Sequence, residues 1–93
     1  MYLIRKTKTF EKSFGKIKNS GTKQSVFKDL GFVIDCLASG SNLPLIYRDH
    51  KLSGELTTLR ECHIKGDLLL IYKIEKENLI LILVDIGSHS QLF

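Results

Sequence analysis

The sequence predicts one α+β domain, spanning residues 1–93, in which two helices pack on one face of a four-stranded, mostly antiparallel sheet. Two observations predict this class. Apolar residues recur with helical spacing in the first 40 residues, after a short strand. In the last 40 residues they alternate or form continuous runs, as in strands. The expected order is therefore strand, helix, helix, strand, strand, strand, with one modest core.

The N-terminal part is expected to contain one strand and both helices. "YLIR", at residues 2–5, reads as a short strand, and "NSG", at residues 19–21, as a break between the helices. The second helix is predicted over residues 23–38, and "SGSN" ends it. In the first helix, apolar residues at i, i+4 and i+7 face the core, and a threonine caps the first turn. These residues are Phe10, Phe14 and Ile17, with Thr7 or Thr9 as the cap.

The C-terminal part is expected to form three strands after an irregular segment at residues 43–54. The strands are predicted over residues 56–64, 67–74 and 79–86, the last two joined by the turn "EKEN". Alternation in the first strand places Cys62 and Ile64 on one face, with Glu61 and His63 on the other.

The last two strands are nearly continuous apolar runs, which implies that both of their faces are covered. Two helices can cover only one face of the sheet. The other face is therefore expected to be a cleft or the seat of a partner chain. By simple alternation, Asp85 in the last strand should share a face with Leu83 and Gly87.

All three histidines lie after residue 49, and each by itself can be an ordinary surface residue. His63 and Asp67 flank a tight turn, so their side chains are expected within a few ångströms on the face opposite the helices. His50 lies just upstream of the strand that carries His63, and His89 follows the last strand. Histidine can accept or donate a proton near neutral pH. Three imidazoles and a carboxylate in one cleft would suit acid–base cleavage of a phosphodiester.

Charge favours an anionic partner but does not require one. The 14 Lys and Arg residues exceed the 10 Asp and Glu residues, for a net charge of +4. This excess suits a nucleic acid or an acidic protein, or a lysine-rich surface that only contacts solvent. Neither CxxC nor HExxH occurs, so no metal site and no cofactor are expected.

The sequence also predicts a cytoplasmic protein without membrane contact. Its longest apolar run, residues 79–84, is too short to span a bilayer, and the first ten residues do not resemble a signal peptide. Cys36 and Cys62 are far apart in the sequence and are expected to be reduced, buried thiols.

Three segments resemble the YafQ toxins, bacterial type II toxins of the RelE superfamily. They are "YRDHKLSG", "RECHIKGDLLLIYKI" and "GSHSQLF", at residues 47–54, 60–74 and 87–93. The resemblance implies a RelE-like fold and a ribosome-dependent mRNA endonuclease, or mRNA interferase, that cleaves without a metal through the ribose 2′-hydroxyl. It also implies a cognate antitoxin, similar to DinJ or RelB, with an acidic toxin-binding segment. Operator DNA would be contacted only through the toxin–antitoxin complex.

Site residues follow from the same resemblance, position by position. It implies an acid–base set and a residue that positions a base, and it leaves open which histidine is the acid. Two positions depart from the family: Asp85 stands where an arginine is common, and Leu68 where a tryptophan often follows the catalytic aspartate. A carboxylate would repel the phosphate, so other cations would have to compensate or activity would be weakened. The implied acid–base set is His50, His63, Asp67 and His89, and Phe93 is implied to position a base. Leu68 is also expected to contact substrate, and Arg48, Lys51 and Arg60 are the cations that could replace the missing arginine.

Two other functions stay open at this point. One is a ParE-type toxin that binds DNA gyrase and has no histidine set. The other is a catalytically weak homologue that acts mainly as an antitoxin-binding module. The three histidines argue against the first, whereas Asp85 argues slightly for it.

Overall fold

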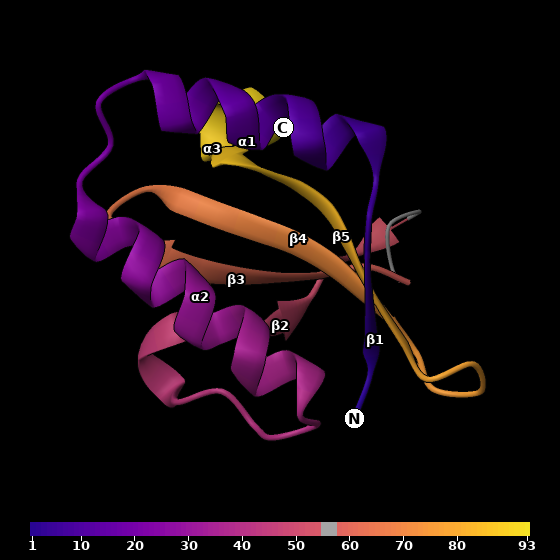
Figure 1. The fold of residues 1–93 in the computed structure, drawn as a ribbon. Coiled ribbons are helices and arrows are strands. Elements are labelled where there is room, and N and C mark those ends of the chain that lie inside the picture. The colour runs from indigo at the N-terminus through magenta and orange to yellow at the C-terminus, as the bar shows by residue number, and fades with distance from the viewer. Residues whose placement is uncertain (55–57) are drawn as a thin grey trace.

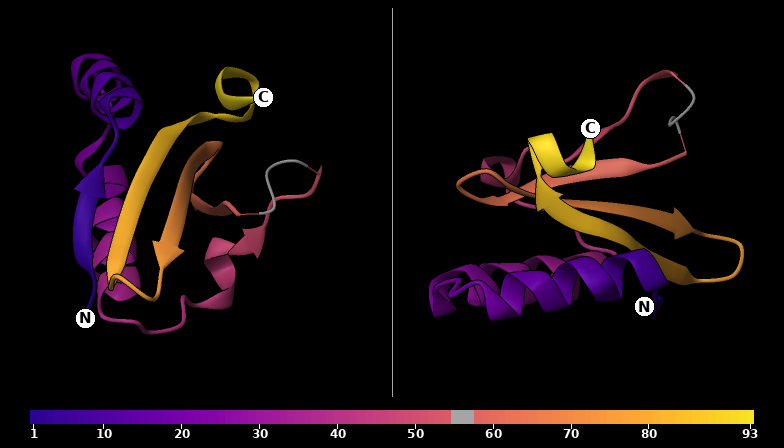
Figure 2. Two further views of the ribbon diagram at one scale, coloured as in Figure 1. Left: turned by 90° about the vertical axis from the view of Figure 1, so that its right-hand side faces the viewer. Right: turned by 90° about the horizontal axis from the view of Figure 1, so that it is seen from above.

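The computed structural model describes residues 1–54 and 58–93 and shows a mixed sheet with helices on both sides. In Figure 1, α1 and α2 lie in front of the sheet, and the right-hand view of Figure 2 shows α3 on its other side. The elements are β1 (Leu3–Lys6), α1 (Lys8–Asn19), α2 (Gln24–Ala38), the 3-10 turn η1 (Leu45–Tyr47), β2 (His50–Lys51), β3 (Arg60–Lys65), β4 (Leu68–Glu75), β5 (Ile80–Ser88) and α3 (His89–Leu92).

The expectation of four strands is corrected, because the sheet has five strands in the order β1-β5-β4-β3-β2. β1 runs parallel to β5, and the other pairs are antiparallel. The additional strand, β2, has two residues: His50 pairs with Glu61 and Lys51 with Arg60. A two-residue strand has no periodic pattern of its own, so the sequence predicted an irregular segment at this position. The four-residue helix α3 was missed for the same reason.

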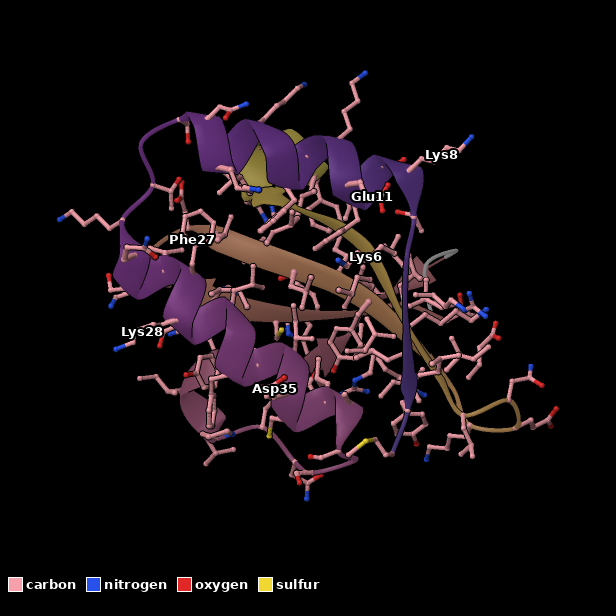
Figure 3. All side chains as sticks on the ribbon, in the orientation of Figure 1. Lys6, Lys8, Glu11, Phe27, Lys28 and Asp35 are labelled. Atoms are coloured by element: carbon pink, nitrogen blue, oxygen red, sulfur yellow. The ribbon has the colours of Figure 1, made fainter. Side chains whose placement is uncertain are left out.

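The two predicted helices are confirmed, and Thr7 is the cap of α1. Its side-chain oxygen accepts a hydrogen bond from the Phe10 N–H at 2.9 Å, and its hydroxyl donates to the Val84 carbonyl at 2.6 Å. One threonine therefore both starts the helix and ties it to β5. Figure 3 shows Phe27 near the junction of the two helices, where its ring meets Phe14 edge-on at 5.9 Å.

The predicted alternation in β3 is also confirmed. Cys62 and Ile64 are buried in the core between sheet and helices, and Glu61 and His63 lie on the other face. The strand begins at Arg60, and the part of the prediction that falls on residues 55–57 lies outside the described residues.

The apolar run of β4 is buried on both faces, as predicted. Leu70 and Tyr72 belong to the core under the helices, whereas Leu69 and Ile71 are 2% and 6% exposed on the opposite face. Among the described residues, none of the helices has the length and apolar character needed to cross a bilayer.

A register shift between β4 and β5 corrects the simple alternation expected for Asp85. Ile71 pairs with Asp85, but the next residue, Tyr72, pairs with Leu83. Val84 is thus an extra residue, as in a β-bulge. Because neighbouring residues of β4 face opposite sides, Asp85 and Leu83 do too, and Leu83 lies in the core.

Candidate active site

A row of paired residues crosses the sheet on the face turned away from α1 and α2. His50 of β2 pairs with Glu61 of β3, Glu61 with Ile71 of β4, and Ile71 with Asp85 of β5. Directly paired residues project to the same face of a sheet. His63 lies two residues beyond Glu61 on β3 and joins this face, so β2 and β3 bring two histidines and a carboxylate together.

Glu61 lies between the two imidazoles. Its Oε1 is 3.7 Å from Nε2 of His50 and 3.5 Å from Nε2 of His63, and the two rings have centroids 6.2 Å apart. Within residues 1–54 and 58–93, Glu61 is the one buried polar or charged residue, at 5% exposure. Burial of a carboxylate is unfavourable unless a positive charge or donor compensates it. Glu61 therefore faces two half-exposed imidazoles that form ion pairs with its carboxylate when they carry a proton.

The other ring nitrogen of His50 is bound to the backbone. Nδ1 lies 2.7 Å from the carbonyl oxygen of Arg48. Arg48 has a left-handed backbone conformation, with φ of 49°, and its N–H donates to the Leu45 carbonyl at the end of η1. The 3-10 turn thereby presents the carbonyl that holds the ring of His50.

His89 and Phe93 lie at the two ends of α3, with ring centroids 5.1 Å apart. Ser88, the last residue of β5, caps this helix in a capping box with Gln91 and pairs with Leu68. This pairing therefore places His89 beside Leu68, the first residue of β4. Both His89 and Phe93 are exposed.

Asp67 lies exposed in the turn between β3 and β4. In the described part of the chain, no ion pair joins it to His63, which pairs instead with Glu61. The carboxylate that pairs with His63 is thus Glu61, two residues before the histidine. Asp67 stays available to solvent beside Leu68.

Lys51 and Arg60 are not brought to the histidine face. They pair with each other, and Arg60 pairs with Tyr72, so all three face the helix side. The guanidinium of Arg60 binds Asp49 with two hydrogen bonds, from Nε at 3.2 Å and from Nη2 at 3.1 Å. The Tyr72 hydroxyl also donates to Asp49. Alternation along β3 already places Arg60 on the face of Cys62 and Ile64, but its contact with Asp49 could not be read from the sequence.

This network shifts the pKa values of its members. The hydrogen bond to Asp49 raises the pKa of Arg60, although burial opposes the shift. Burial and the hydrogen bond to Asp49 together raise the pKa of Tyr72. Arg60 is therefore held in an ion pair with Asp49 on the helix side of the sheet.

Asp85 has a backbone partner. Its Oδ1 accepts a hydrogen bond from the N–H of Ile86 at 2.8 Å, next to the register shift in β5. The carboxylate thus satisfies a backbone donor at the irregular part of the strand.

Residues 2–93 match the family described as "Bacterial toxin of type II toxin-antitoxin system, YafQ". The chain belongs to the YafQ toxin family. Similar solved structures include a metal-bound toxin from Helicobacter pylori, which is 42% identical, with a TM-score of 0.90 and 100% of both chains covered. The DinJ–YafQ complex of Escherichia coli matches 100% of this chain and 99% of that one, at 26% identity and a TM-score of 0.86.

Curated relatives match over shorter stretches. The "mRNA interferase toxin YafQ" of Escherichia coli is 37% identical over 51 residues, which are 55% of this chain and 53% of the relative. A Haemophilus influenzae protein that carries the name YafQ is 52% identical over 40 residues, or 43% of this chain and 39% of that protein. The chain thus spans about half or less of the length of these two relatives.

Within this YafQ-family chain, Glu61 is the site residue that sequence reasoning missed. The sequence did contain an indication of its role, because strand alternation placed Glu61 on the same face as His63. Its approach to His50 depends on β2, which no pattern indicated. In the part of the chain that is described, no three His, Cys, Asp or Glu side chains are grouped so as to hold a metal ion.

Proposed function

We propose that this YafQ-family toxin is an mRNA endonuclease that cuts mRNA on translating ribosomes in the cytoplasm. The observation that carries the proposal is the pair of accessible imidazoles, His50 and His63, held around the buried carboxylate of Glu61. His89 and Phe93 on α3 complete the site from the end of β5. Asp67 and Leu68 lie at the start of β4, beside them.

The proposed reaction needs only proton transfer by side chains of this chain. One imidazole takes the proton of the ribose 2′-hydroxyl, whose oxygen attacks the phosphorus. The bond from phosphorus to the 5′ oxygen breaks, and a second group donates a proton to that oxygen. The products are a 2′,3′-cyclic phosphate and a free 5′-hydroxyl. Glu61 supports the reaction because its carboxylate lies 3.7 Å and 3.5 Å from the imidazoles and offsets the charge that one of them gains as it takes up the proton.

The ribosome would hold and orient the substrate. The chain carries a net charge of only +4, so its own surface attracts RNA weakly. A bound and oriented mRNA would remove most of the entropic cost of reaching the reactive geometry.

An in vitro translation assay with primer extension on the mRNA tests the proposal. Cleavage is expected on ribosomes and not on free RNA, and His63→Ala or His89→Ala should lower it by roughly two to four orders of magnitude. Lys73→Ala, which changes a half-buried, ion-paired lysine on β4, is the control. Equal cleavage of free and ribosome-bound RNA would count against ribosome dependence. Full toxicity of a folded His63→Ala/His89→Ala double variant would refute the site assignment.

The proposed partner is a DinJ-like antitoxin with an acidic segment that folds onto the basic surface of the toxin. Operator DNA would be contacted only by that complex. α1 presents lysines to solvent, and Lys8 points away from the sheet in Figure 3. Affinity should fall as the ionic strength rises to the physiological value, and a salt-independent affinity would exclude the electrostatic part of the proposal. Lys8, Lys12 and Lys16 on α1 and Lys51 on β2 are the expected contacts.

A further inference from the structure

A cavity of about 540 Å³ adjoins the histidine pair. It lies between α2, η1 and the turn from β3 to β4, and His63 forms part of its wall. The ring of His63 lies 6.2 Å from that of His50, so the cavity opens beside the proposed site of cleavage. Its volume falls within the range of about 300–1,000 Å³ that is typical of small-ligand sites.

The lining combines two cations with apolar side chains. Arg48 and Lys65 supply the positive charges, and Ile46 and Tyr47 supply the apolar surface. The ring of Tyr47 is supported by Phe32, at 5.9 Å between centroids. Cations beside an aromatic ring suit a nucleotide, whose phosphate binds the charges and whose base stacks on the ring.

Asp29 and Lys65 form an ion pair across this cavity. Oδ2 of Asp29 lies 3.7 Å from Nζ of Lys65, and these side chains are 34% and 51% exposed. Such exposed pairs contribute little to stability. Lys65 can therefore exchange its partner for a phosphate at small cost, whereas the carboxylate of Asp29 opposes the phosphate.

We propose that this cavity binds one nucleotide of the mRNA next to the scissile phosphate. The phosphate of that nucleotide lies between Arg48 and Lys65, and its base packs on Ile46 and Tyr47. Asp29 acts as a counter-charge that the phosphate displaces. The proposal rests on the proposed function, because it assigns a subsite for the same RNA substrate.

The test is an NMR titration of the full chain with a short single-stranded RNA; the chain carries His89→Ala, outside the cavity, so that no RNA is cut during the titration. In this background Lys65→Gln should weaken binding about tenfold, the loss of one charge-assisted contact. Asp29→Asn should strengthen binding severalfold, because it removes the opposing charge and leaves the side-chain shape. Lys73→Gln is the matched control: Lys73 forms a similar pair with Glu75 at 3.6 Å, outside the cavity, and should bind as the parent does.

Lys65→Gln is expected to weaken RNA binding and Asp29→Asn to strengthen it, so the two variants together decide the outcome. Unchanged binding in both variants, or weaker binding in Asp29→Asn, would overturn the proposal. An equal loss in Lys73→Gln would also overturn it, since RNA would then be attracted by charge in general. The titration measures RNA binding and needs no cleavage. If the variants change RNA affinity as expected but the parent cuts no mRNA on ribosomes, the proposed function is refuted and the RNA-binding subsite is retained. Ribosome-dependent cleavage without these changes in affinity would refute the subsite alone.

Discussion

Nδ1 of His50 lies 2.7 Å from the carbonyl oxygen of Arg48, two residues earlier in the chain. A carbonyl oxygen can only accept a hydrogen bond, so Nδ1 carries the proton in the neutral ring. Nε2 is then the ring nitrogen that can exchange a proton with a substrate, and it is also the nitrogen nearest Glu61. The left-handed conformation of Arg48 aims this carbonyl at His50.

The first prediction concerns that tautomer. Nitrogen-15 NMR of neutral His50 should show a protonated Nδ1. Arg48→Gly should keep this tautomer, because glycine adopts the left-handed conformation readily. Arg48→Val should give a mixture of tautomers and lower stability by about 1–3 kcal/mol, because a β-branched residue is strained there. A neutral parent ring protonated mainly at Nε2 would contradict the role given to the Arg48 carbonyl.

The second prediction separates the catalytic and structural roles of Glu61. Glu61→Gln keeps the side-chain volume but removes the negative charge beside the imidazole that takes up a proton in the reaction, so mRNA cleavage should fall about tenfold or more. The free energy of unfolding should change little or rise, because a buried charge no longer has to be compensated. Cleavage assays and urea unfolding measure the two effects. Glu75→Gln, which alters an exposed ion pair on β4, should change neither. Parent-level cleavage by folded Glu61→Gln would leave the carboxylate without a catalytic role.

The third prediction concerns Asp85. If its charge repels the scissile phosphate, Asp85→Asn should raise ribosome-dependent cleavage, because it removes that charge. The structure should be kept, because the amide oxygen can still accept the hydrogen bond from the Ile86 N–H. Asp85→Arg adds a favourable charge and should raise cleavage about tenfold or more. It also loses the backbone contact and should lower stability by about 1 kcal/mol. Primer extension at saturating ribosomes, with thermal unfolding of each variant, measures both effects. Slower cleavage by both folded variants would make Asp85 a working part of the site.

The fourth prediction is a pH dependence of stability that comes from Tyr72. The pKa of Tyr72 is raised in the folded protein. Its contribution to the free energy of unfolding is therefore complete below the ordinary tyrosine pKa of about 10 and is lost as the pH rises through the pKa of the folded protein. Tyr72→Phe should lower the free energy of unfolding by about 1–2 kcal/mol at neutral pH, because Asp49 loses a donor. The difference between parent and variant should shrink above about pH 10.

Denaturant unfolding at several pH values measures this difference. Burial raises the pKa of Cys62 to about 12, which weakens both proteins at high pH, but this contribution cancels in the comparison. A difference that stays constant from pH 7 to pH 11 would show that the hydroxyl of Tyr72 is not the titrating group.

The sequence by itself determined the elements that depend on local patterns. Phe10, Phe14 and Ile17 at helical spacing predicted α1, and the alternation of Cys62 and Ile64 with His63 predicted the faces of β3. These predictions succeed because each pattern reports which side of one element is buried. The segments that resemble the YafQ toxins predicted the family in the same way, since they could be read along the chain.

Only the tertiary structure decided which residues from different strands meet. The two-residue strand β2 brings His50 to Glu61, and the fold brings Asp49 to Arg60 on the opposite face. The register shift beside Asp85 likewise reverses the face expected from alternation with Leu83. The physical reason is that periodicity specifies the buried side of one strand, whereas strand register depends on backbone hydrogen bonds between distant segments.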